Sequence, residues 1–267
     1  MSRRPDLRAL AALFVLTLRQ HFRGRRLLVL SLLFALPGVL AAVVAVTSRG
    51  APAAALEFAF VFNLIPHALA PLAALLYAAG IIQDEVEEQT LTYLLLRPLP
   101  HWALYLVRLL ATLLVTTFLC VVFTTATFAV IAVTASEPAA AGLIGRAWKM
   151  AVLLALTQVA YCGVFGLLGL LMRQSFLAGV VYIAALEGLL ATIPTVGRRL
   201  TMMYYFRVLV LRWLAPAAGR DWQIDLVTAP PARTCVLTLL TVGIVSALLA
   251  SLLFAGREFR MKTPEGT

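Results

Sequence analysis

The chain has 267 residues, of which 62% are hydrophobic and only 13% are charged. Soluble domains carry about 25% charged residues, so this chain has too little polar surface to cover a fold exposed to water. Its net charge of +10 suits anionic lipid headgroups, because the basic residues form neither a face of a soluble fold nor an aromatic-basic platform for nucleic acid. We therefore predict an all-α, polytopic membrane protein that contacts membrane lipid and binds no nucleic acid.

Residues 1–26 are predicted to form a basic amphipathic helix lying in the headgroup plane. They contain seven arginines, and Leu7, Leu10, Phe14 and Leu18 recur between them at helical spacing. A cleaved signal peptide is the competing interpretation. It is disfavoured because the apolar run that follows is about 20 residues long and no small-x-small cleavage site comes after it.

Six apolar runs are long enough to be predicted as transmembrane helices, since crossing a bilayer takes about 20 residues. They cover residues 27–47, 58–82, 104–134, 147–172, 176–194 and 235–255. Pro37 in the first run, and Pro66 and Pro71 in the second, predict kinks that neighbouring helices can accommodate. Arg108 lies one turn inside the third run and is expected to extend its charge toward the headgroups.

Six crossings place both ends of the chain on one side of the membrane. The arginines of residues 1–26 and the basic tail 257–267 mark that side as cytoplasmic. We expect an N-terminal helix over 1–26, a six-span domain over 27–256 and a cytoplasmic tail. The abundance of alanine, and of arginine over lysine, indicates a GC-rich bacterium and hence its inner (plasma) membrane.

The segment 195–234 conflicts with this orientation, because it lies outside by the span count yet holds six arginines. Two interpretations remain. The segment is an ordered outer cap with Met203–Leu214 as an interfacial helix, or Tyr204–Leu214 dips into the membrane and the span count is wrong by one. The cap is favoured, because Arg207 and Arg212 would interrupt a spanning run.

Glu187 is the only carboxylate well inside a predicted span, where burial is costly unless the group is paired or protonated. It is a candidate intramembrane polar site that lines a substrate path. The alternative is a carboxyl group hydrogen-bonded to a neighbouring helix, or one that lies closer to the outer headgroups.

Motifs for catalysis and for metal binding are missing. The sequence has no G-x-x-x-x-G-K-[ST], G-x-S-x-G or H-E-x-x-H motif, its three histidines are scattered, and its three cysteines lie in apolar runs at no metal-ligand spacing. We therefore expect no enzymatic activity, no metal and no cofactor in this chain.

Residues 84–98, between the second and third runs, are predicted to form a short amphipathic helix. Four acids in its first turn suit the positive end of the helix dipole, three leucines share one face, and a proline ends it. These residues are Asp84, Glu85, Glu87, Glu88, Leu91, Leu94, Leu95 and Pro98. A solvated polar loop is the competing interpretation.

Residues 80–108 resemble the permease subunits of ABC transporters of the ABC-2 type. The shared features are acids, a Thr-Leu pair, a leucine-rich turn and a proline in the loop after the second span. The matching residues are Glu85, Glu88, Thr90, Leu91, Leu94, Leu95, Arg97 and Pro98. Gln89, His101 and Arg108 depart from the residues that are common in the family.

The resemblance implies a permease subunit without its own ATPase, which exports an unidentified substrate. It would work as a homodimer or heterodimer with two copies of an ABC ATP-binding subunit, which bind ATP and Mg. Residues 84–98 would be the cytoplasmic coupling helix, with the leucines in a groove of the ATPase and the acids at its rim. The implied docking residues are Asp84, Glu85, Glu87, Glu88, Thr90, Leu91, Leu94, Leu95, Arg97 and Pro98.

A stand-alone secondary transporter or channel is the alternative function. It predicts inverted repeats and ionisable residues at mid-membrane, and the sequence offers only Glu187 and no convincing repeat. A membrane enzyme is less well supported, because the catalytic motifs are missing.

Overall fold

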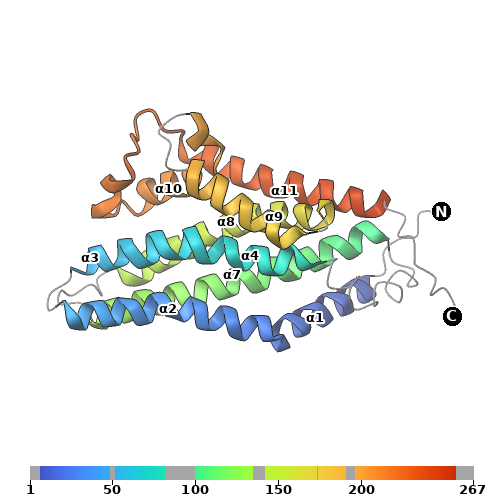
Figure 1. Cartoon of the computed structure of the whole chain (residues 1–267), viewed down its shortest axis with the longest axis horizontal. Helices are drawn as coiled ribbons and strands as arrows, with labels where there is room; N and C mark the ends of the chain where they lie inside the picture. Colours follow the sequence, from blue (N-terminus) through green and yellow to red (C-terminus); the bar gives the residue numbers. More distant parts are fainter. Residues whose placement is uncertain are drawn as a thin grey trace.

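The computed structural model describes residues 7–48, 52–81, 100–134, 142–172, 174–190 and 196–256, and within these ranges every regular element is helical. Figure 1 shows the long helices lying side by side along one axis. The predicted all-α class is therefore confirmed. The segments labelled η are 3-10 or π-helical stretches. The elements are α1 (Leu7–Arg23), α2 (Arg25–Thr47), α3 (Ala53–Leu56), η1 (Glu57–Leu69), α4 (Ala70–Ala78), α7 (His101–Thr134), α8 (Leu143–Leu171), α9 (Ser175–Tyr182), η2 (Ile183–Leu190), η3 (Val196–Leu200), α10 (Met202–Trp213), η4 (Ala217–Trp222) and α11 (Ala232–Gly256).

Five helical stretches in the described residues are long and apolar enough to cross a membrane. They are Arg25–Thr47, Ala53–Ala78, His101–Thr134, Leu143–Leu171 and Ala232–Gly256. They correspond to five of the six predicted spans. The remaining one, predicted over 176–194, is a shorter apolar helix over Ser175–Leu189, which is compatible with a sixth crossing.

The second and fourth spans begin earlier than their apolar runs, and a partly buried ion pair joins their first turns. Glu57 Oε1 accepts a hydrogen bond from Arg146 Nη2 at 2.9 Å, and Glu57 is buried. The two charges satisfy each other, so each helix extends past the point where its apolar sequence stops.

Contacts between the spans define two ends of the bundle. At the proximal end, Arg108 near the start of α7 contacts Ile81 after α4, and the rings of Tyr105 and Phe254 lie 6.1 Å apart. At the distal end, Glu57 pairs with Arg146. The first residue of α1 and the last of α11 lie toward the same end in Figure 1, which agrees with an even number of crossings.

Helix α1 packs along α7 and does not lie apart from the bundle. Leu13 and Thr17 are buried on the face toward it, and His21 Nε2 lies 3.1 Å from Thr112 Oγ1. The His21 ring also packs edge-on against Tyr77. The helix is present as predicted, while its placement in the headgroup plane stays a prediction.

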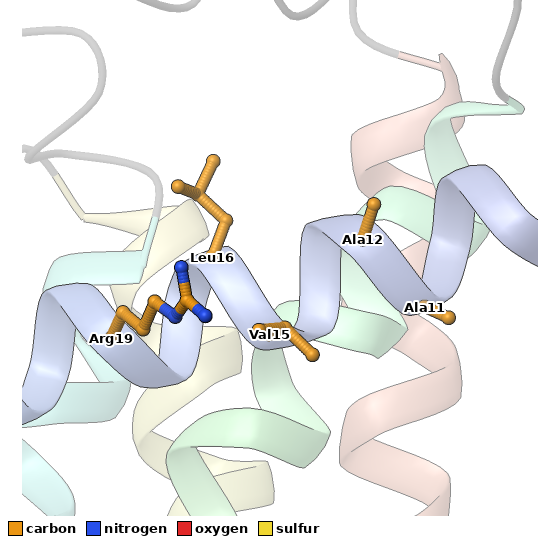
Figure 2. Close-up of a pocket in the computed structure, with 5 residues that line it drawn as sticks. All are labelled: Ala11, Ala12, Val15, Leu16 and Arg19. Atoms are coloured by element: carbon orange, nitrogen blue, oxygen red, sulfur yellow. The ribbon is translucent and has the colours of Figure 1, made fainter.

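The opposite face of α1 is exposed and carries both apolar and basic side chains. A groove there is lined by Ala11, Ala12, Val15, Leu16 and Arg19, and Figure 2 shows these side chains along the length of the helix. Val15 and Leu16 are 45% and 50% exposed. Since one apolar face contacts α7, this second face is available to lipid, with arginine beside it.

The fourth span, α8, is the central helix, and glycines let its neighbours approach it closely. A Cβ on Gly163 would overlap the backbone of Gly243 in α11, and one on Gly169 would overlap Ala79. Gly163, Gly166 and Gly169 recur every three residues along α8, a pattern typical of closely packed membrane helices, and these contacts agree with it.

We predict that Gly163→Ala lowers the thermal unfolding temperature of the purified protein in detergent. Its new methyl group meets the Gly243 backbone, which cannot move as a side chain can, so we expect a cost of about 1–3 kcal/mol. Gly145→Ala is the matched control, because Gly145 lies on the same helix with no atom within 4 Å of the added carbon. Equal unfolding temperatures for the two variants would contradict the close approach of α8 and α11.

Candidate functional site

The predicted docking residues all fall outside the described residues. Asp84, Glu85, Glu87, Glu88, Thr90, Leu91, Leu94, Leu95, Arg97 and Pro98 lie within 82–99. The structure describes the residues on either side of this segment, Ile81 before it and Pro100 after it. Both flanking residues belong to the proximal end of the bundle.

Arg108 joins the two helices that flank this segment. It is only 5% exposed, and its Nη1 donates a hydrogen bond to the backbone oxygen of Ile81 at 3.2 Å. A backbone carbonyl only accepts hydrogen bonds and a guanidinium only donates them, so the two are suitable partners inside the bundle. The expectation that Arg108 extends to the headgroups was wrong, because this carbonyl holds the side chain inside the bundle.

Glu187 is buried at the beginning of another helix. Its two carboxylate oxygens accept hydrogen bonds from the backbone N–H groups of Met202 and Met203, each at 3.1 Å. Thr201 Oγ1 accepts a third bond, from the N–H of Tyr204 at 3.2 Å. These are the first N–H groups of α10, which have no partner inside the helix and favour negative charge. This arrangement matches the alternative in which the carboxyl group is hydrogen-bonded to a neighbouring helix.

Helix α10 packs one face against the spans. Met203, Phe206 and Leu209 are fully buried, and Trp213 at its end accepts a hydrogen bond from Lys149 Nζ of α8 at 3.0 Å. The Glu187 carboxylate, which accepts from the first N–H groups of α10, fixes the start of this helix against the bundle. Both interpretations of the segment, an interfacial helix and one that dips into the membrane, stay predictions.

Two of the six arginines that conflict with the expected orientation, Arg198 and Arg212, form hydrogen bonds within this part of the chain. We call residues 196–231 the distal cap. Arg198 Nη1 donates to the backbone oxygen of Gln223 at 3.3 Å, and Arg212 Nη2 donates to those of Leu226 and Ala229 at 3.0 and 3.1 Å. These arginines stabilise the loops of the cap, which gives them a role other than orientation.

A group of polar side chains connects the distal cap to the second span. Arg207 Nη2 contacts His67 Nε2, and the Arg207 guanidinium carbon lies 5.6 Å from the centre of the Trp222 ring. Trp222 Nε1 donates to Asn63 Oδ1 at 3.0 Å. We call this group, together with Glu187, the distal polar cluster.

Sequence reasoning identified Glu187 in this cluster and missed the other members. Asn63 and His67 are about 140 to 160 positions from their partners in the chain, so no local spacing connects them. Gln158 was missed for the same reason. Its Nε2 donates to the backbone oxygen of Ala70 at 3.0 Å, where the second span changes from η1 to α4.

A family model described as "ABC-2 family transporter protein" matches residues 23–187. The match covers more than half of the chain, from the start of the first span to Glu187. The chain belongs to this family. No curated protein matches it. The family prediction made from residues 80–108 is confirmed, and the protein is a multi-pass membrane permease of the ABC transporter class. In this ABC-2 permease, Asn63, His67 and Glu187 of the distal polar cluster lie in the matched region. Arg207 and Trp222 belong to the distal cap, which follows that region.

We predict that Glu187→Ala loosens the start of α10. Two buried N–H groups lose their acceptor, at a cost of about 1–3 kcal/mol each. Limited digestion with trypsin should then cut faster after Arg199, which is exposed just before the helix.

Asp225→Ala is the control for this digestion, since Asp225 makes its contacts inside an exposed turn of the cap. If Glu187→Ala and Asp225→Ala are cut after Arg199 at the wild-type rate, Glu187 does not hold α10 in place.

Proposed function

We propose that this chain is the permease subunit of an ABC exporter and is driven by a separate ATP-binding subunit. Membership of the ABC-2 family, by a match that includes residues 82–99, is the observation that carries the proposal. The partner binds ATP and Mg, while this chain supplies the path across the membrane. Two permeases, identical or different, assemble with two copies of the ATPase.

The coupling helix of this proposal is residues 84–98. Leu91, Leu94 and Leu95 fill a groove on the ATPase, and the acids before them set the orientation at its rim. Docking of this kind places the site of ATP-driven motion between the second and third spans.

The contact between Arg108 and Ile81 supports the transmission of that motion. A displaced coupling helix pulls on the end of α4 and on the start of α7, which this hydrogen bond joins. The two helices then move together, as expected for a packed bundle that has two discrete arrangements.

The proximal end faces the cytoplasm of a bacterial cell in this proposal, with both chain termini on that side. Arg19, Arg23 and Arg25 are exposed on α1 and at the start of α2. Anionic lipids of the cytoplasmic leaflet attract such side chains, and the groove on α1 accepts the apolar part of the lipid interface.

We predict that Leu94→Asp and Glu88→Arg each abolish co-purification with the ATPase while the permease still inserts into the membrane. A charge on the leucine face cannot enter an apolar groove, and reversing the charge at the rim opposes docking by several kcal/mol. The measurement is co-purification of a tagged permease with its ATPase, followed by ATP hydrolysis in vesicles.

Asp225→Arg is the matched charge reversal at the distal end, where the side chain is exposed, and it should leave assembly unchanged. Full stimulated ATP hydrolysis with both docking variants would reject the docking site. Transport by the purified permease without any ATPase would favour the stand-alone transporter instead.

A further inference from the structure

The side chain of Arg207 sits where the distal cap meets the second span. Its Nη2 contacts His67 Nε2 in η1, its guanidinium faces the Trp222 ring of the cap, and the Glu187 carboxylate attracts its charge. His67 lies ten positions along the span from Glu57. Arg207 therefore fastens α10 on the order of 10–15 Å inside the distal end of the bundle.

The hydrogen bonds of His67 define its protonation state. Its Nδ1 lies 3.0 Å from the backbone oxygen of Asn63. A carbonyl oxygen only accepts, so Nδ1 carries the hydrogen and donates it. A guanidinium only donates, so Nε2 must offer its lone pair to Arg207. The ring is neutral in this arrangement.

A second proton on His67 is incompatible with the contact. It would turn Nε2 into a donor and set an imidazolium against a guanidinium, which removes the hydrogen bond and adds repulsion between like charges. The positive charge of Arg198 also repels the cation at Arg207. The oxygens of Glu187 accept from the N–H groups of Met202 and Met203, and the described groups that act on His67 are Arg207 and Asn63 rather than Glu187.

The neighbouring groups do not replace the lost interaction. Tyr161 faces Arg207 and Glu187 with a neutral hydroxyl group, and the ring of Trp222 is also neutral. The second span is π-helical at His67 and contains Pro66 beside it. Such stretches have irregular backbone hydrogen bonding and adjust more easily than an α-helix.

We propose that the contact between Arg207 and His67 is an acid-released latch, which fastens the distal cap to the second span. The latched ring is neutral, and the released ring takes up a proton near pH ~6.5, as histidine does in water. The latch is at full strength above that pH and weakens by about tenfold for each unit below it. In a transporter, it makes opening at the distal end sensitive to the pH on that side.

The test is hydrogen–deuterium exchange of the full-length protein in lipid nanodiscs. Protection of the amides in 202–213 is compared at pH 7.5 and pH 5.5, after correction with an unfolded reference for the intrinsic effect of pH on exchange. In the wild-type protein, protection should fall about tenfold at the lower pH. No fall in the wild-type protein would overturn the proposal.

Two variants each change one of the two residues that form the latch. His67→Gln offers Arg207 an oxygen that takes up no proton, and Arg207→Gln removes the cation that repels a charged ring. His67→Gln should make the protection of 202–213 independent of pH, and Arg207→Gln should make its fall at low pH smaller than in the wild-type protein. A fall of wild-type size in either variant would overturn the proposal.

His21→Gln is the matched control. His21 also bonds to a neighbouring span, through Thr112, but it belongs to α1. It should keep the response of α10 to acid. If His21→Gln removes that response as His67→Gln does, the acid effect does not come from the latch, and the proposal is wrong.

Discussion

The described bundle depends on one constraint, that polar groups inside it must find partners there, since lipid offers none. Three long polar side chains satisfy this constraint in the same way, by forming hydrogen bonds to the backbone of another segment. Arg108 binds the carbonyl of Ile81 after the second span, Gln158 binds the carbonyl of Ala70 where that span changes from π-helix to α-helix, and Glu187 binds the N–H groups that begin α10. Each polar group thus finds its partner on the backbone of a neighbouring segment.

These hydrogen bonds stabilise different ends of the permease. At the proximal end, Arg108 ties together the helices on either side of residues 82–99, where an ATPase would act. At the distal end, Glu187 and Arg207 hold a cap whose helix α10 packs against the spans. Between them, α8 packs closely against its neighbours through glycine and connects the two ends of the bundle.

The all-helical class, five of the spans and the family could be predicted from the sequence, because apolar runs and the motif around 84–98 are local patterns. The partner of Glu187 could not, since backbone N–H groups leave no mark in a sequence. The early start of the second span also escaped prediction, because Glu57 is tolerated only through Arg146 from a distant helix. Arg108 was misjudged for a related reason, as its acceptor is a carbonyl 27 positions away.

The central claim is that the segment between the second and third spans faces the cytoplasm, where an ATPase can reach it. A cysteine placed at Gln89 and a cysteine placed at Val227, which is 92% exposed in the distal cap, test this directly with an impermeant thiol reagent. The three native cysteines are buried and give little background. In intact cells the account predicts labelling at 227 only, with labelling at 89 after permeabilisation. Labelling at 89 in intact cells would contradict it.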